Sequence, residues 1–327
     1  MKIIHGPIEI AGQMGILCGA LKEMGHHAYG YNYFQTYLQY KENIINSDLF
    51  EIGKIAGDVI NYFDIFHFHY ASTFLPDYKD LELLARIGKP IIMHHWGNDV
   101  RKTSIALLNN SYVYTGDSPS EDEIDRKLTK IGKFASAAIV QDYEVLPYVA
   151  PYYKKVFVLP LALNLTRFIP AYPEPFNNVP LVIHAPTNPE FKGTAAVEKV
   201  IKELEKVATF QYKRIENMSH EEAVRLYNQA DIIIDQILCG SYGLLSVEAM
   251  ALGKPVIAFI RDDLVSGYEI TPPICNANPD TLYTVLKDLL SSGEVRRQKG
   301  MAGRKFVESY HDSRLVAKQL VTIYGNL

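Results

Sequence analysis

The sequence predicts an α/β protein made of two doubly wound domains, each built on a parallel sheet. Short apolar runs alternate with amphipathic segments of helical length along most of the 327 residues, which is typical of repeated β/α units. One proline-rich segment, 160–180, interrupts this alternation and has the composition of an interdomain linker. The length also suits two domains of ordinary size.

The first half begins with a predicted strand, a glycine-bearing loop and a helix that ends at Gly25. The pattern Ser120-x-x-Glu123 is a capping box and predicts the start of another helix. The first loop, 6–12, lacks the spacing Gly-x-Gly-x-x-Gly, which disfavours a nicotinamide cofactor. The predicted strands are 2–5, 63–69, 90–95, 137–140 and 155–159, and the predicted helices are 14–24, 81–87 and 120–134.

The second half repeats the alternation after the linker. Asn278 and Pro279 supply an N-cap and a proline at the first helical position, so a helix is predicted to begin there. The other predicted helices are 195–207, 221–229, 246–252 and 303–324, and the predicted strands are 181–184, 230–235 and 255–259.

A glycine loop between strand 230–235 and helix 246–252 is the most informative segment. Gly240 and Gly243 allow positive φ and a close approach of a ligand to the backbone. A strand, a glycine loop and a helix N-terminus together form an anion site, because free N–H groups and the helix dipole point at the loop. Glu248 lies one turn inside the helix, and its carboxylate can accept hydrogen bonds from sugar hydroxyls. The segment therefore predicts a nucleotide or nucleotide-sugar pocket.

Residues 240–258 form the run Gly-x-x-Gly-Leu-x-x-x-Glu-Ala-Met-Ala-x-Gly-x-Pro-Val-Ile-Ala. This run resembles the nucleotide-sugar loop of GT-B glycosyltransferases, in particular the retaining group called family 4. The resemblance implies two Rossmann-like domains facing a cleft, and transfer of a sugar from a nucleotide-diphosphate donor to a hydroxyl of a glycan or lipid-linked acceptor. It also implies retention of configuration without a metal or other cofactor. The implied parts are 1–165 on the acceptor side, 166–305 for the nucleotide sugar, and 306–327, a helix packing back on the first domain.

The resemblance assigns the donor site to the second half. Glu248 would bind the ribose, while Lys192 and the amides of the glycine loop would stabilise the leaving diphosphate. Two positions depart from the family: Gly240 replaces the first of two glutamates, and Thr187 replaces an arginine. The expected donor-binding residues are Thr187, Lys192, Gly240, Ser241, Tyr242, Gly243, Leu244 and Glu248.

The acceptor side is expected around the end of strand 90–95. In the resembling family this strand ends His-Gly-x-Asp, and alignment on Gly97 and Asp99 puts Trp96 at the place of the histidine. Strand alternation lets one of His94 and His95 face the cleft, and we choose His95, with Asp99, as catalytic. The other expected acceptor-side residues are Gly12, Gln13, His94 and Arg101. Asp99 and Arg101 are equally explained as an ion pair within a loop.

Three alternatives remain open. The replaced charges at positions 240 and 187 favour a non-catalytic GT-B protein that binds sugar nucleotides. A sugar-nucleotide epimerase of the same fold would need no acceptor. A metal-dependent hydrolase could use a set of imidazoles, since alternate strand positions share a face, although no further ligands recur at strand ends in the second half. Its candidate ligands are His67, His69, His94 and His95.

Composition limits the partners. The net charge is −4 and no run of five basic residues occurs, so a nucleic-acid partner is disfavoured. The three cysteines are far apart in the sequence and fit a reducing cytoplasm. No apolar stretch approaches the roughly 20 residues that span a bilayer, so we expect a cytoplasmic protein that would meet a lipid acceptor peripherally.

Overall fold

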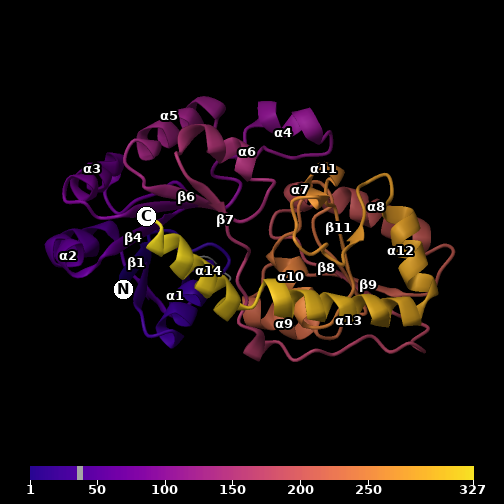
Figure 1. Ribbon diagram of the computed structural model, residues 1–327. Coiled ribbons are helices and arrows are strands. Elements are labelled where there is room, and N and C mark those ends of the chain that lie inside the picture. Colours follow the sequence, from indigo (N-terminus) through magenta and orange to yellow (C-terminus); the bar gives the residue numbers. More distant parts are fainter. Residues whose placement is uncertain (35–39) are drawn as a thin grey trace. The chain divides into compact units, whose positions relative to one another are not determined.

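The computed structural model describes residues 1–34 and 40–327, which divide into two compact units (Figure 1). The N-terminal unit comprises 1–105, 118–162 and 313–327, and the C-terminal unit comprises 106–117 and 163–312. The main division therefore falls after Ala162, near the start of the predicted linker.

The N-terminal unit is built on a seven-stranded parallel sheet with the order β3-β2-β1-β4-β5-β6-β7. The direction of winding reverses between β1 and β4, and in open α/β sheets ligands bind beyond the carboxyl ends of the strands at such a switch point. The strands are β1 (Lys2–Gly6), β2 (His27–Asn32), β3 (Ile44–Asn46), β4 (Ile65–His69), β5 (Ile91–His95), β6 (Ala137–Val140) and β7 (Val156–Val158).

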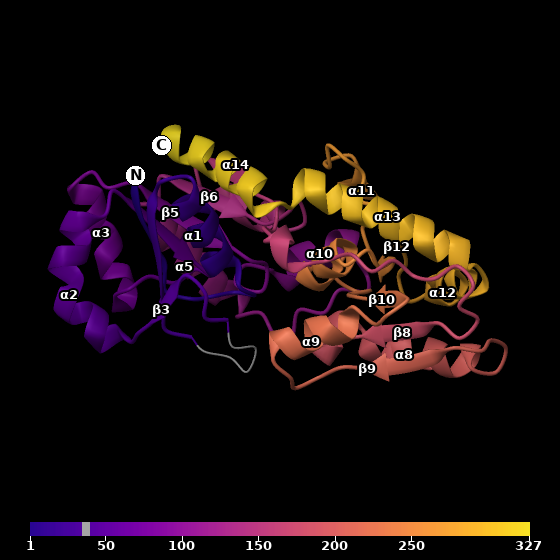
Figure 2. The same cartoon turned by 90° about the horizontal axis from the view of Figure 1, so that it is seen from below.

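Helices cover this sheet, and two that are far apart in sequence pack together. Helices α1 (Gln13–Glu23) and α14 (Ser313–Gly325) share an apolar core, in which Leu17 and Leu21 pack in the same cluster as Leu320. Figure 2 shows α14 beside the strands of this unit. The remaining helical segments of the first 162 residues are α2 (Leu49–Tyr62), η1 (Pro76–Tyr78), α3 (Lys79–Arg86), α4 (Thr103–Asn109), α5 (Glu121–Gly132), α6 (Leu146–Val149) and η2 (Ala150–Tyr152).

The C-terminal unit is built on a five-stranded parallel sheet with the order β12-β11-β10-β8-β9, whose switch point lies between β8 and β10. Its strands are β8 (Leu181–His184), β9 (Gln211–Arg214), β10 (Ile232–Ile234), β11 (Val256–Ala258) and β12 (Cys275–Asn276). Its helical segments are η3 (Leu165–Arg167), α7 (Pro189–Lys192), α8 (Thr194–Leu204), α9 (His220–Tyr227), α10 (Leu244–Ala251), α11 (Asp262–Val265), α12 (Leu282–Ser291) and α13 (Gly293–Tyr310).

The segment 106–117 belongs to the C-terminal unit although it lies in the first half of the chain. Asn110 Nδ2 donates to the carbonyl oxygens of Leu238 and Cys239, at 2.7 and 3.1 Å. Further along, Asn188 Nδ2 donates to Asp117 Oδ2 at 3.0 Å. The segment is therefore bound directly to the loop that precedes Gly240, which the sequence pattern did not predict.

The predicted helix 303–324 is two helices in the structure. α13 ends at Tyr310 and α14 begins at Ser313. His311 is buried with its Nε2 3.0 Å from the hydroxyl of Tyr242, and the backbone of Asp312 forms a β-bridge with Leu163. These tertiary contacts take the two residues out of the helix.

The helix predicted to begin at Asn278 and Pro279 begins instead at Leu282, as α12. The side chain of Asn278 accepts hydrogen bonds from the N–H groups of Asp280 and Thr281, at 3.0 and 3.2 Å. These are the bonds of an N-cap, the role predicted for Asn278, and the N–H of Leu282 donates to the carbonyl oxygen of Asn278 at 3.0 Å. Residues 279–281 form a turn, and the regular helix follows it.

Within the described ranges 1–34 and 40–327, no helix combines the length and apolar character needed to cross a bilayer. The three cysteines, all of which the structure describes, are buried free thiols.

Candidate functional site

A polar cluster occupies the switch point of the C-terminal sheet. Lys192 ends α7, and Asp235 and Gln236 directly follow β10. The ammonium of Lys192 donates to Asp235 Oδ1 at 2.6 Å and to Gln236 Oε1 at 2.8 Å. Burial would raise the pKa of Asp235, but the charge and hydrogen bond of Lys192 hold this pKa below its ordinary value. The expected donor-side lysine thus lies at the carboxyl edge of the sheet, paired with an internal carboxylate.

The same carboxylate binds the N-terminus of α10. Asp235 Oδ2 accepts from the N–H groups of Gly243 and Ser246, at 3.1 and 3.2 Å, and from the hydroxyl of Ser246 at 2.6 Å. The loop amide of Gly243 is therefore already engaged, contrary to the expectation that it is ready for a diphosphate. Sequence reasoning missed Asp235 and Gln236. Their signal was two polar residues directly after a buried strand, where α/β folds bind ligands.

The first half of the glycine loop packs within the protein. Gly240 has φ +88°, and a Cβ built on it would lie 2.7 Å from Arg261 Cγ, which explains why no glutamate stands here. The carbonyl of buried Ser241 accepts a hydrogen bond from Gln236. The ring of Tyr242 is buried. These contacts do not support donor-binding roles for the side chains of Ser241 and Tyr242.

The remaining expected donor residues differ in exposure. Glu248 is 4% exposed on α10, and its Oε1 lies 2.5 Å from Nε2 of His220, at the start of α9. Burial lowers the pKa of His220, but the charge of Glu248 and their hydrogen bond raise it above its ordinary value. Leu244 begins α10, and Thr187 is exposed in the loop after β8. The sequence held no signal for the His220–Glu248 contact, because the two residues are 28 positions apart.

His94 and His95 point to opposite faces of the N-terminal sheet. His95 is fully buried, with Nδ1 2.7 Å from Asp99 Oδ2 and Nε2 2.9 Å from the hydroxyl of Tyr153. Asp99 Oδ1 accepts from the N–H groups of Trp96 and Gly97, at 2.9 and 3.1 Å. His95 and Asp99 thus brace the turn after β5. The geometry does not support our choice of His95 as the ring open to a substrate, because both of its nitrogens are engaged.

Arg101 forms a buried ion pair. Its guanidinium donates twice to Glu144, at 2.9 and 2.7 Å, and a third time to Asn98 Oδ1 at 2.8 Å. Arg101 and Glu144 are 2% and 1% exposed. The partner of Arg101 is therefore Glu144, not Asp99, and this bidentate pair holds the loop after β5 to the segment after β6.

The first loop of the N-terminal unit contains a buried carboxyl group, that of Glu9. Oxygens of Glu9 accept from the N–H groups of Met14 and Gly15, at 3.1 and 2.9 Å, beside Gly12 at the start of α1. Burial raises the pKa of Glu9 to about 8, although these hydrogen bonds act in the other direction. Gln13 exchanges two hydrogen bonds with the backbone of Ala162, at 3.0 and 2.8 Å. Glu9, which sequence reasoning missed, and Gln13 therefore have structural contacts that the resemblance did not imply.

Four imidazoles lie together on one face of β1, β4 and β5, together with Trp96 and Tyr324. They are His5, His67, His69 and His94, and all are at most 1% exposed. One nitrogen of each of His5, His67 and His69 lies within 4.8 Å of the others, as for metal ligands. However, the rings of His67 and His69 are stacked, 7° from parallel with centroids 4.7 Å apart, so their in-plane lone pairs do not converge on one ion.

The hydrolase alternative also needed His95 in this group. His95 lies on the opposite face with Asp99 and Tyr153, so the four predicted ligands do not form one set.

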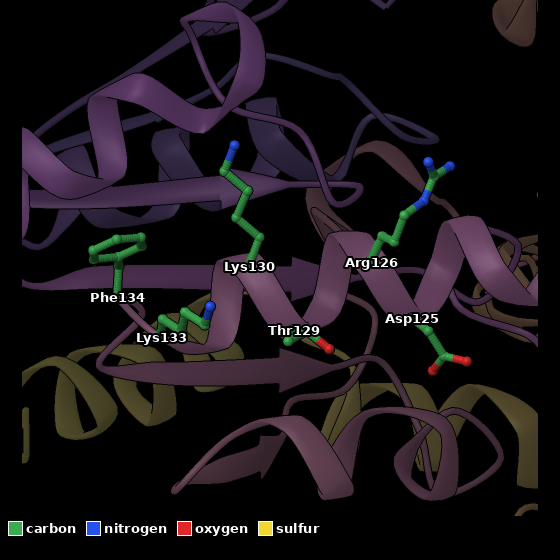
Figure 3. Close-up of a pocket in the computed structure, with 6 residues that line it drawn as sticks. All are labelled: Asp125, Arg126, Thr129, Lys130, Lys133 and Phe134. Atoms are coloured by element: carbon green, nitrogen blue, oxygen red, sulfur yellow. The ribbon is translucent and has the colours of Figure 1, made fainter.

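A surface hollow of about 520 Å³ lies along α5, outside every predicted site (Figure 3). Figure 3 shows Arg126 and Lys130 extending from one side of the helix and Asp125 from the other. The lining residues are Asp125, Arg126, Thr129, Lys130, Lys133 and Phe134. They are side chains of one helix and its end, and they do not converge on a common point in the figure.

Two doubly wound parallel-sheet units in one chain are the architecture of the GT-B fold, and solved structures of that fold match this chain. Sucrose-phosphate synthase from Thermosynechococcus elongatus is 14% identical with a TM-score of 0.66, covering 100% of this chain and 99% of that one. Anabaena HepE in complex with UDP-glucose is 12% identical, with a TM-score of 0.64 and 100% of both chains covered.

A third similar structure is a putative UDP-N-acetylglucosamine 2-epimerase from Listeria monocytogenes. It is 14% identical with a TM-score of 0.53, and the match covers 98% of this chain and 94% of that one. No family model and no curated protein matches the sequence. The likeness establishes the GT-B fold predicted from the glycine loop.

Proposed function

We propose that the protein is a glycosyltransferase that moves a sugar from a nucleotide-diphosphate donor to a hydroxyl of a glycan or lipid-linked acceptor, with retention and without a metal. One observation carries the proposal. At the switch point of the C-terminal sheet, the ammonium of Lys192 lies beside Gly243, the residue that precedes α10. A Cβ built on Gly243 would be only 3.2 Å from Lys192 Nζ. Glu248 lies on the same helix, just over one turn further along. The fold is one in which HepE has been solved with UDP-glucose.

The chemistry of this corner suits a diphosphate followed by a ribose. A diphosphate carries more negative charge than Asp235 and would compete for the ammonium of Lys192, which is 11% exposed. The resulting ion pair would stabilise the leaving group electrostatically. The carboxylate of Glu248 would accept hydrogen bonds from the ribose hydroxyls in exchange for its contact with His220.

Two other functions have an observation in their favour. The similarity to a putative 2-epimerase favours acceptor-independent chemistry on the donor sugar. The pairing of Lys192 with Asp235 favours a protein that binds sugar nucleotides and turns none over. Each of these alternatives gives a distinct result in one assay.

The assay is release of nucleoside diphosphate from UDP-, GDP- and ADP-sugars by purified protein, with and without glycan and lipid-linked acceptors. The proposal expects release that depends on an acceptor. Conversion of the donor sugar without an acceptor would establish the epimerase, and tight binding with no turnover in any mixture would establish the binding protein.

Substitution of Glu248 tests the site itself. Glu248→Ala should weaken nucleotide binding by about 1.5–3 kcal/mol, roughly 10- to 150-fold, because the hydroxyls lose a charged acceptor. Glu221→Ala, which removes an exposed carboxylate from α9, is the matched control and should bind like the wild type. Unchanged affinity in Glu248→Ala would contradict the ribose role. Lys192→Ala should slow transfer more than it weakens binding of the nucleoside.

A further inference from the structure

The imidazoles of the N-terminal unit form one continuous chain of hydrogen bonds with Trp96 and Tyr324. Trp96 Nε1 lies 3.3 Å from His69 Nδ1, and His69 Nε2 lies 3.0 Å from His5 Nδ1. His5 Nε2 lies 3.2 Å from the hydroxyl of Tyr324, which is 2.7 Å from His67 Nδ1.

The last link joins His67 Nε2 to His94 Nδ1 at 3.2 Å. The remaining nitrogen, His94 Nε2, is buried and has no hydrogen-bond partner among the residues that the structure describes. An unpaired buried polar group costs about 1–3 kcal/mol and is uncommon in folded proteins. The open end of the chain therefore requires an explanation.

The direction of the chain follows from its first member. An indole N–H donates and cannot accept, so His69 Nδ1 must be an acceptor. Burial lowers the pKa of His5 to about 3, and burial likewise lowers the pKa values of His67, His69 and His94. Each ring is therefore neutral near pH 7 and carries a single N–H.

A neutral ring that accepts at Nδ1 must donate from Nε2. His69 therefore donates to His5, and His5 donates to the oxygen of Tyr324. The tyrosine hydroxyl then donates to His67, which donates to Nδ1 of His94. All four rings hold their proton on Nε2, and the one N–H left over is that of His94.

We infer that Trp96 fixes this chain in one direction, and that His94 Nε2–H is a hydrogen-bond donor for an oxygen of the sugar acceptor. His94 is then a positioning residue and not the base that deprotonates the acceptor hydroxyl, because neither of its nitrogens has a free lone pair. This role rests on the proposed function, whereas the direction of the chain does not.

The fixed direction of the hydrogen-bond chain depends on residue 96 being a tryptophan. In the family that the sequence resembles, a histidine stands at the position of Trp96. A histidine there could donate or accept, and the direction of the chain could reverse. An indole cannot lose its proton at any ordinary pH, so reversal would require breaking its bond to His69.

The direction is tested without any substrate by long-range ¹H–¹⁵N correlation spectra of ¹⁵N-histidine-labelled protein at pH 7. We expect protonated Nε2 and unprotonated Nδ1 in all four rings. Tyr324→Phe should release His67 and His94 into mixed tautomers, while Trp96 still holds His69 and His5. Trp96→Phe should release all four rings.

Tyr153→Phe is the matched control, because Tyr153 contacts His95 on the opposite face of β5, and it should leave the four rings unchanged. A proton on Nδ1 of His94, an imidazolium in the cluster, or wild-type tautomers in Trp96→Phe would overturn the fixed direction.

The role of His94 is tested by conservative rescue. Glutamine can donate an N–H but cannot act as a base. His94→Gln should therefore retain at least 10-fold more acceptor-dependent nucleotide release than His94→Ala. Equal loss in both variants, with the tautomers of His5, His67 and His69 intact, would overturn the donor role and leave the proposed transferase activity standing.

Discussion

Lowering the pH should destabilise the N-terminal unit through its four buried imidazoles. In the folded state the pKa of His5 is about 3, and those of His67, His69 and His94 are well below 6.5. In the unfolded chain each has a pKa of about 6.5. The unfolded state therefore binds more protons as the pH falls, so the stabilisation is fully present above pH 6.5 and is lost below it.

The size of the effect follows from the proton balance. Between pH 7.5 and pH 5.5 each unfolded imidazole becomes protonated while the folded one stays neutral, which lowers the free energy of unfolding by about 1.4 kcal/mol. Four imidazoles that all stay neutral in the folded state together give about 5.5 kcal/mol, comparable with the whole stability of a small domain.

The assay is urea unfolding at the two pH values, followed by the fluorescence of Trp96, the only tryptophan of the chain. His5→Asn should be less stable at both pH values, but its loss between them should be about 1.4 kcal/mol smaller than that of the wild type. Glu9, whose raised pKa acts in the opposite direction, contributes equally to both proteins and cancels in the comparison.

His27→Asn is the control, since His27 is exposed on β2, and it should lose as much stability as the wild type. If His5→Asn also loses as much as the wild type, the imidazole of His5 does not stay neutral in the folded protein, and the argument from burial fails.

Three further predictions use urea unfolding at pH 7.5. Gly240→Ala should lower the free energy of unfolding by about 1–3 kcal/mol or more, because φ is +88° and the new Cβ would lie 2.7 Å from the side chain of Arg261. Gly25→Ala is the control: φ is +82° but the space around it is open, so the loss should be smaller. Arg101→Met should cost about 3–5 kcal/mol by leaving Glu144 buried and unpaired, and adding Glu144→Leu should recover most of that loss. Gln13→Ala should lower the free energy of unfolding by about 2–6 kcal/mol, because it leaves two buried backbone groups of Ala162 unpaired at about 1–3 kcal/mol each. A loss below about 0.5 kcal/mol, as at an exposed position, would contradict this reasoning.

The fold was predictable because its evidence is local. The strand predicted at 181–184 is β8 without any shift, since a run of buried apolar residues after a proline needs no knowledge of the rest of the chain. The break at His311 was not predictable, because it depends on a contact with Tyr242, 69 positions away. The same holds for segment 106–117, whose attachment to residues 238 and 239 leaves no periodic pattern.

The sequence predicted on which elements the candidate residues lie, but not their contacts. Lys192 was expected at the carboxyl edge of the second sheet and Glu248 one turn inside the helix after the glycine loop, and both lie there. The pairing of Lys192 with Asp235 and of Glu248 with His220 could not be predicted. At β5, alternation correctly required His94 and His95 to face opposite ways. The ring with both nitrogens hydrogen-bonded is His95, and this could not be predicted because one partner, Tyr153, lies 58 positions later in the chain.

The placement of segment 106–117 has a consequence for how this protein could be divided or recombined. The chain passes from one unit to the other at four junctions, after residues 105, 117, 162 and 312. A fragment beginning at 163 would lack Asn110 and leave the carbonyls of Leu238 and Cys239 without the amide that binds them. Exchanging the C-terminal unit for that of a relative would therefore require replacing residues 106–117 together with residues 163–312, so a single crossover at the linker would split the unit.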